Sequence, residues 1–254
     1  MEPNASRLTL TMARDQMADM HPADIAGIIS QLSHKHIQTV LISLDTETAG
    51  EAIHELEPEL RSRIISQLDS EQASDILEEM APDEAADVLG DLPEEKAKEL
   101  LELMDEEEAE EIQELLEHEE NTAGGLMNSD FIAIVVSATV GEALEEVRRL
   151  APEVEMVYYI YILDADERPL GVMSLKELMI RPTETPVAEV MTTSLKTVGV
   201  ESEPEDVLEL IAKYSLIAVP VLDEDGKMAG IVTVDDTLEL FLPYALRRRR
   251  YSHH

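Results

Sequence analysis

Hydrophobic residues recur with a period of twelve between residues 21 and 116. Small or apolar side chains occupy positions 5, 8, 9 and 12 of each unit, except for Arg61 at position 5 and Gln113 at position 9. This i, i+3, i+4, i+7 spacing predicts one apolar face of a helix, so each unit should hold a helix of two to three turns and a tight turn. The eight units begin at His21, Ser33, Asp45, Glu57, Asp69, Ala81, Pro93 and Asp105.

A helix of this length cannot bury its apolar face alone, so neighbouring units must stack on one another. The sequence therefore predicts a helical-repeat domain over residues 21–120, preceded by an N-terminal extension over residues 1–20. The methionines Met80 and Met104 fall on position 12 and are expected in the core rather than in a soft-metal site.

A different pattern begins after the paired glycines Gly124 and Gly125, which mark a turn. Short β-rich runs follow at Phe131–Val136, Val157–Leu163 and Leu170–Met173. These runs predict strands that alternate with helices, in contrast to the all-helical first half.

The second half also repeats internally. Leu126–Ser129 resembles Val190–Thr193, sixty-four positions later, and Gly171–Ser174 resembles Gly230–Thr233, fifty-nine positions later. We therefore expect two β-α-β-β-α modules, over residues 126–186 and 187–242. A linker over residues 121–130 precedes them and overlaps the first, and a basic tail over residues 243–254 follows. The fold class predicted for the whole chain is α+β with two domains.

Charge changes the picture of the first half. The chain carries 56 acidic and 19 basic residues, a formal net charge of −37, and residues 1–120 hold 33 of the acids and 7 of the bases. Such a surface repels nucleic acid and attracts cations. Mg²⁺ and Ca²⁺ both prefer oxygen ligands, so converging carboxylates would favour hard divalent cations. For a single carboxylate, a solvated surface remains the simpler interpretation.

Several classes of protein and site are disfavoured by composition. The absence of cysteine excludes disulfides and thiolate metal sites and suits the cytosol. Tryptophan is absent and aromatic residues are scarce, which argues against a stacking surface for nucleic acid. No apolar stretch approaches the roughly 18–20 residues that span a bilayer. The histidines share no ligand spacing and are expected on the surface: His21, His34, His36, His54 and His118.

The segment Gly230–Asp236 carries the pattern Gly-x-x-Thr-x-x-Asp, which resembles the nucleotide-binding motif of CBS domains. The resemblance implies that Thr233 contacts a phosphate and that Asp236 accepts ribose hydroxyls of ATP or AMP. In the first module Glu177 stands where the aspartate is expected, so nucleotide binding should be weaker there. The alternative is structural, with Thr233 as a helix N-cap and Asp236 as its capping partner.

The order of the parts identifies a family. Helical repeats, then Asn121–Met127, then two CBS-like modules resemble the cytosolic half of MgtE-family magnesium transporters. The resemblance implies a right-handed α-superhelix followed by a CBS pair that forms a homodimer, located in the cytoplasm at or near the inner face of the cell membrane. It also implies that Mg²⁺ closes the acidic domain onto the CBS modules and so controls a membrane pore domain, in the same chain or in a separate protein.

The same resemblance supplies candidate metal ligands, residue by residue. In the helical domain they are Glu51, Asp83 and Asp87. In the second module they are Glu203, Glu205, Asp236 and Glu239. Ser215 stands where the family has an acid, so at least one cation site should be weaker or missing.

Past the second module the chain departs from the family, because Pro243 would interrupt a linking helix and Arg247–Arg250 are basic. We expect either an excised fragment or a stand-alone relative. The alternative function is an adenine-nucleotide sensor that acts without its own pore; a plain interaction scaffold is a further rival. No nucleophile–base pair and no Gly-rich phosphate loop with a lysine is present in the sequence, so an enzyme is not expected.

Overall fold

A computed structural model describes residues 20–119, 121–152, 154 and 156–241. These residues form two compact units, one built almost wholly from the helical repeats and one that takes in residues 113–241. The basic tail and nearly all of the N-terminal extension lie outside the described residues. No helix in the described ranges is long and apolar enough to cross a membrane.

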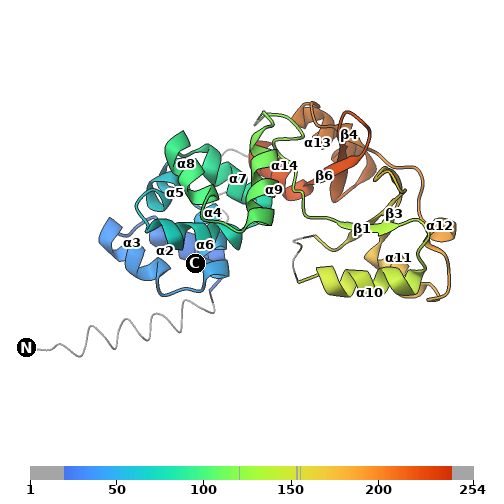
Figure 1. Ribbon diagram of the computed structural model, residues 1–254, viewed down its shortest axis with the longest axis horizontal. Coiled ribbons are helices and arrows are strands. Elements are labelled where there is room, and N and C mark those ends of the chain that lie inside the picture. Colours follow the sequence, from blue (N-terminus) through green and yellow to red (C-terminus); the bar gives the residue numbers. More distant parts are fainter. Residues whose placement is uncertain (1–19, 120, 153, 155, 242–254) are drawn as a thin grey trace, which may run out of the picture. The chain divides into compact units, whose positions relative to one another are not determined.

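The eight predicted repeat helices are all present, and each begins at position 2 of its unit (Figure 1). Prolines at the first helical position, such as Pro22 and Pro58, suit a helix start because proline lacks only a donor that would be unpaired there. The helices are α2 (Pro22–Ile29), α3 (His34–Leu41), α4 (Thr46–His54), α5 (Pro58–Ile65), α6 (Ser70–Glu78), α7 (Pro82–Gly90), α8 (Glu94–Leu101) and α9 (Glu106–Leu116).

Position 1 of the unit serves as the N-cap in several repeats. The Asp45 carboxylate accepts a hydrogen bond from the Thr48 amide at 2.9 Å, and Asp69 accepts one from Glu71 at 3.2 Å. The bond from Thr48 lowers the pKa of Asp45. An acid at this place satisfies an otherwise unpaired amide and complements the helix dipole.

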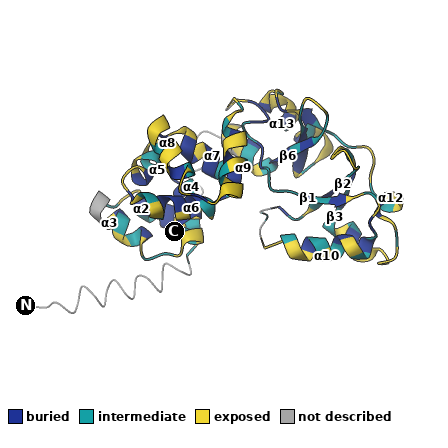
Figure 2. Cartoon of the chain, viewed as in Figure 1, coloured by how far each residue is buried: buried dark blue, intermediate teal, exposed yellow. Residues whose placement is uncertain are grey.

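The predicted apolar stripe forms the core of the repeats, as the buried inner face in Figure 2 shows. Ile25, Ile53, Ile65 and Leu77 are fully buried. The exposed Gln113 departs from the pattern as its polarity predicts. Arg61 also breaks the apolar pattern, but it is buried in spite of its charge. Alanine or isoleucine fills the same position in every other unit.

Within the repeats, α2 packs against α4, α4 against α6 and α6 against α8, so each of these helices contacts the helix two units along the chain. Hydrogen bonds follow the same rule. Ser62 Oγ donates to the carbonyl of Asp91 at 3.1 Å, and Ser74 Oγ donates to the carbonyl of Leu100 at 3.2 Å. The array is therefore continuous through side-chain and backbone contacts as well as through its apolar core.

The second unit contains the two predicted modules, each with a three-stranded sheet of one parallel and one antiparallel pair. The first consists of β1 (Ile132–Val135), α10 (Val140–Leu150), β2 (Tyr159–Leu163), β3 (Pro169–Ser174) and α11 (Leu175–Ile180). The short helix α12 (Val187–Val190) leads to the second, which consists of β4 (Val198–Gly199), α13 (Pro204–Tyr214), β5 (Ala218–Leu222), β6 (Met228–Thr233) and α14 (Val234–Phe241).

The two modules exchange their leading segments. Asn128, which precedes β1 in the first module, pairs antiparallel with Ile231 of the second. Thr192, sixty-four positions later, pairs in the same way with Val172 of the first. Equivalent residues of the internal repeat therefore make equivalent contacts in opposite modules, and this exchange ties the modules into one unit.

A second apolar cluster lies where the sheets of the two modules meet. Tyr161 of β2 packs there with Met228 and Ile231 of β6, and the rings of Phe131 and Tyr161 lie nearly perpendicular at a centroid distance of 6.2 Å. Burial raises the pKa of the Tyr161 hydroxyl well above its usual range, with a smaller contribution from Tyr159. The hydroxyl is buried without a hydrogen-bond partner.

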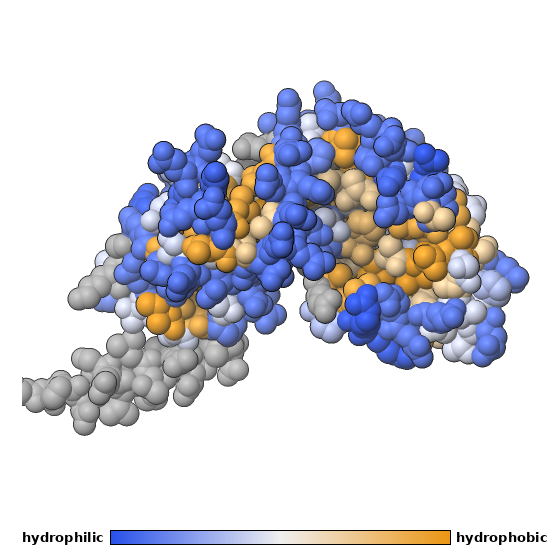
Figure 3. Space-filling model, viewed as in Figure 1, coloured by the Kyte–Doolittle hydropathy of each residue, from blue (hydrophilic) through white to orange (hydrophobic). Residues whose placement is uncertain are grey.

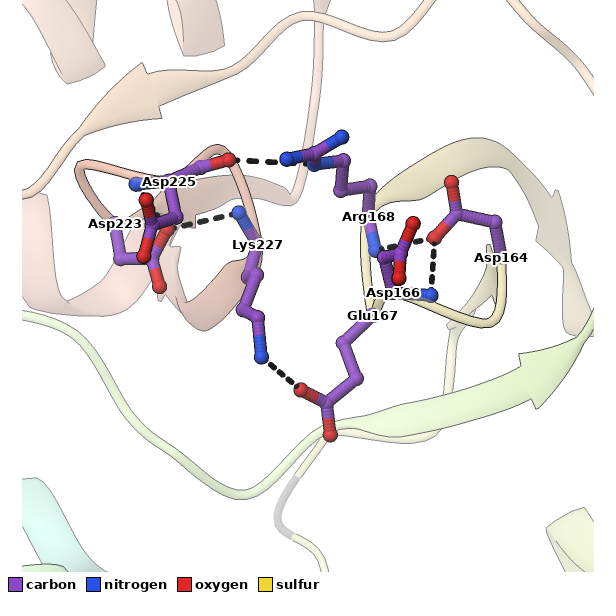
Figure 4. A network of polar contacts seen from close by, with 7 residues as sticks. All are labelled: Asp164, Asp166, Glu167, Arg168, Asp223, Asp225 and Lys227. Atoms are coloured by element: carbon purple, nitrogen blue, oxygen red, sulfur yellow. Dashed lines mark hydrogen bonds and ion pairs between the residues drawn. The ribbon is translucent and has the colours of Figure 1, made fainter.

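The β2–β3 and β5–β6 turns are built alike (Figure 4). The carboxylates of Asp164 and Asp223 each accept two backbone amides of their own turn, at 2.8–3.0 Å. Both turns need a positive φ one residue before their basic residue. The second turn uses Gly226 (φ 78°), whereas the first uses Glu167 (φ 62°), a conformation that side chains other than glycine rarely adopt.

These two turns also contact each other across the modules (Figure 4). Lys227 Nζ lies 2.7 Å from the Glu167 carboxylate, and Arg168 Nε donates to the carbonyl of Asp225 at 3.3 Å. The amide of Met228 donates to the Glu167 carbonyl at 3.1 Å. Glu167, which has the positive φ, is thus held through both its side-chain carboxylate and its backbone carbonyl.

Candidate metal and nucleotide sites

Glu51 is the candidate ligand on α4, and it is exposed. Partial desolvation raises the pKa of its carboxyl, and repulsion from Glu47 adds to the rise, while the neighbouring His21 opposes it. A carboxylate held among other acids is stabilised in its ionised form by a nearby cation, because the cation offsets the same repulsion that raises the pKa.

Hydrophilic residues cover most of the visible surface over the repeats, with apolar patches between them (Figure 3).

Asp83 and Asp87 lie four residues apart on α7 and so on the same side of the helix. Asp83 is half-buried and Asp87 is exposed. One turn beyond Asp87 stands Asp91, whose carboxylate accepts a hydrogen bond from the Arg61 guanidinium at 3.0 Å. Three aspartates therefore follow one another at four-residue spacing, and the last of them is already neutralised by a buried arginine.

Glu203 and Glu205 stand at the start of α13, where Glu203 is the N-cap residue but makes no side-chain capping bond. Both are exposed, and together with Asn121, Pro204 and Leu240 they line a cavity of about 470 Å³. The amide of Asn121 adds a neutral oxygen to the two carboxylates, a donor set that Mg²⁺ and Ca²⁺ accept.

Thr233 and Asp236 occupy the junction of β6 and α14. The amide of Thr233 donates to the Asp236 carboxylate at 2.6 Å, and the amide of Asp236 approaches Thr233 Oγ1 at 3.4 Å. This is the reciprocal capping arrangement that the sequence allowed as the structural alternative. Ser174 and Glu177 form the same capping box at the start of α11, and its bonds lower the pKa of Glu177.

Within the described ranges, no three acidic or histidine side chains gather closely enough to hold a metal ion. Glu239 lies in α14, but its side chain is outside the described part. Ser215, at the position where the family has an acid, ends α13 in the left-handed conformation. The candidate ligands lie on α4, on α7, and at or on α13 and α14 of the second module.

Residues 121–124, at the start of the expected linker, belong to the second compact unit. The amides of Ala123 and Gly124 donate to the carbonyls of Ser202 and Val200, each at 2.8 Å, and Thr122 and Ala123 are buried. The segment holds Asn121 beside the start of α13, which explains how a residue outside the module lines its cavity.

Sequence reasoning missed several polar residues. His54 was expected on the surface, but its ring is only 20% exposed and Nδ1 lies 3.4 Å from the Glu84 carboxylate. His118 packs against Gly124, where an added Cβ would lie 2.7 Å from Nδ1. Only Arg61 had a sequence signal, since it alone breaks position 5 of the repeat.

Comparison with known proteins matches nearly all of the described chain. The family description "MgtE intracellular N domain" matches residues 20–121, and "CBS domain" matches residues 123–183 and 187–242. The crystal structure of the cytosolic domain of the Mg²⁺ channel MgtE in complex with ATP is 35% identical, with a TM-score of 0.86 over 90% of this chain and 93% of that one. The soluble part of a magnesium transporter is 30% identical, with a TM-score of 0.86 over 92% of this chain and 93% of that one.

Curated relatives agree over a shorter stretch. The magnesium transporters MgtE of Thermus thermophilus and Enterococcus faecalis are 42% and 36% identical over 121 residues, which is 48% of this chain and 27% of each relative. The matched stretch thus spans about a quarter of the length of these relatives. With the helical repeats and both CBS modules matched in order, the chain belongs to the MgtE family of magnesium transporters.

Proposed function

We propose that the chain is the Mg²⁺-sensing regulatory region of a magnesium transporter or channel. Bound Mg²⁺ closes the acidic helical domain onto the CBS modules, and that closure controls a membrane pore domain in the same chain or in a partner protein. The observation that carries the proposal is the match of both parts, over more than nine-tenths of the chain, to the soluble part of a magnesium transporter.

The electrostatics of the chain favour such a switch. With a net charge of −37, two acidic surfaces brought together repel over a Debye length of about 8–10 Å at ordinary ionic strength. Divalent cations between them reverse the sign of the interaction. Mg²⁺ keeps much of its water and takes one or two carboxylates, which suits small groups such as Glu203 with Glu205. Binding that favours one of two arrangements then shifts the population between them.

The remaining parts of the proposal follow from the same family. The CBS modules form a homodimer, and the chain acts in the cytoplasm close to the inner face of the cell membrane. Its role is regulatory rather than catalytic, and its surface charge disfavours nucleic acid as a partner.

Isothermal titration calorimetry of the full chain with Mg²⁺, at constant ionic strength, tests the proposal. An Asp87→Asn, Asp236→Asn variant should lose much of the binding. Asparagine keeps an oxygen that can accept the Thr233 amide, so the variant removes charge and retains the cap at α14.

The matched control is Asp75→Asn with Glu145→Gln, which removes two exposed carboxylates from α6 and α10 with the same change in charge. This control should bind Mg²⁺ nearly as the wild type does. Equal losses in the two double variants would show that only overall charge matters, and the assigned ligands would be wrong.

A second candidate function is adenine-nucleotide sensing at the second module. A related structure was determined in complex with ATP, and Thr233 and Asp236 stand at the family's nucleotide motif. Thr233 is buried and Asp236 caps α14, so nucleotide must compete with an existing hydrogen bond. If this role dominates, ATP raises the melting temperature and Mg²⁺ alone does not; the opposite result favours the cation sensor.

A further inference from the structure

Arg61 is the only buried charged residue among the described parts of the chain. It occupies position 5 of its unit, which faces the core, and only 8% of its side chain is exposed. An apolar residue would avoid the cost of desolvating a guanidinium, which is large unless the charge is paired and hydrogen-bonded. Packing alone therefore gives no reason for an arginine at this place.

Among the described residues, the guanidinium of Arg61 forms an ion pair with the Asp91 carboxylate at 3.0 Å. Its Nε is buried and makes no hydrogen bond, so the guanidinium is incompletely satisfied. Asp91 follows the end of α7, and its amide bonds to the carbonyl of Asp87, one helical turn earlier. The buried cation therefore lies about one turn beyond a candidate Mg²⁺ ligand.

We propose that Arg61 is a built-in counter-ion that sets the Mg²⁺ affinity of the α7 carboxylates. The guanidinium neutralises Asp91, so a Mg²⁺ ion bound at Asp87 would have one fewer effective negative charge nearby. The inference rests on the proposed Mg²⁺-sensing function and concerns only how strongly that site binds.

The expected size follows from Coulomb's law. One helical turn of 5.4 Å and the ion pair itself place the guanidinium on the order of 10 Å from a cation at Asp87. At that distance in a water-like medium, one unit charge changes the affinity for a divalent ion about threefold at low ionic strength, and less than twofold at physiological salt.

The test is Mg²⁺ calorimetry of the full chain at low ionic strength. Arg61→Met should lower the half-saturating Mg²⁺ concentration about threefold, since it leaves Asp91 uncompensated. Asp91→Asn should raise it by a similar factor, because the arginine charge then acts alone. The double variant should return close to the wild-type value.

This pattern of opposite signs separates an electrostatic role from a structural one. If the pair only holds α5 against α7, both single variants weaken binding and lower the melting temperature, and the proposal is overturned. Arg61→Lys, which keeps the charge, should keep the wild-type half-saturation.

Arg63→Met is the matched control, because Arg63 is exposed on the same helix and the change in net charge is identical. A shift as large in this control as in Arg61→Met would reduce the effect to overall charge and overturn the inference. If the wild type itself shows no Mg²⁺-specific binding, the proposed function fails, whereas an unshifted Arg61→Met in a responsive wild-type background refutes only the role of Arg61.

Discussion

Replacing Gly230 by alanine tests the exchange of segments between the two modules. An added Cβ would lie 2.7 Å from the Asn128 carbonyl oxygen and 2.9 Å from Met127 Cγ. Because the nearest atom belongs to the backbone, relief requires the whole segment before β1 to move. That movement threatens the two hydrogen bonds between Asn128 and Ile231, at 2.8 and 2.9 Å.

The cost can be estimated from these contacts. Overpacking costs roughly 1–3 kcal/mol, and each weakened backbone hydrogen bond costs about 0.5–1.5 kcal/mol. We expect Gly230→Ala to lower the free energy of unfolding of the second unit by about 2–4 kcal/mol. The equivalent Gly171→Ala should cost less, since its closest contact is the flexible side chain of Met191 at 2.7 Å.

Urea unfolding followed by the near-ultraviolet signal of tyrosine measures this directly. The chain has no tryptophan, and the repeats contain no tyrosine. Four tyrosines lie in the described part of the second unit, so the change in signal on unfolding reports on that unit and not on the repeats: Tyr158, Tyr159, Tyr161 and Tyr214. Gly27→Ala is the control: nothing lies within 4 Å of its added Cβ, so this change in α2 should leave the tyrosine transition unaltered. An unchanged transition in Gly230→Ala would refute the reasoning about the exchanged segment.

Three further predictions concern strain and pKa. Glu167→Gly should have a free energy of unfolding in urea about 1 kcal/mol higher than that of Glu167→Ala. Both variants lose the ion pair to Lys227, but only glycine adopts the positive φ without strain. Equal stabilities of the two variants would argue against backbone strain at this position. Burial raises the pKa of Tyr161, so its contribution to the stability of the second unit should be constant below the ordinary tyrosine pKa near 10 and fall as the pH rises above it. Tyr161→Phe, followed by far-ultraviolet melting, should remove that fall. The substitution should cost little stability at neutral pH, because the hydroxyl makes no hydrogen bond. The raised pKa of Glu51 means that its ionised form destabilises the repeats. Glu51→Gln should therefore raise the melting temperature in chelator and reduce the further rise in melting temperature when Mg²⁺ is added. A lower melting temperature of the variant in chelator would contradict this account.

The helical repeats were predictable because their signal is local and repeated. A period of twelve with apolar residues at fixed positions specifies both the helix and the face it buries, and every helix begins one residue into its unit. The β-α-β-β-α order was predictable for a related reason, since the same short motifs recur in the same order in both copies. Gly230 is one of the glycines in these repeated motifs, and the close Asn128 carbonyl oxygen excludes a larger side chain there.

The contacts between modules could not be predicted from such patterns. Nothing local indicates that Asn128 pairs with Ile231, a partner more than one hundred positions away, or that Ala123 donates a hydrogen bond to the Ser202 carbonyl of the second module. The candidate ligands could be named only through family resemblance, because an acidic residue on a helix surface has the same sequence pattern whether or not it binds a cation. Arg61 was visible as an exception in the repeat, but its partner Asp91 was not.

The most direct test of the central claim is small-angle X-ray scattering of the full chain in chelator, in millimolar Mg²⁺, and in NaCl of matched ionic strength. The account predicts that Mg²⁺ lowers the radius of gyration well below the value in matched NaCl, and that the Asp87→Asn, Asp236→Asn variant shows little of this compaction. A radius of gyration that is the same in all three solutions would contradict the account.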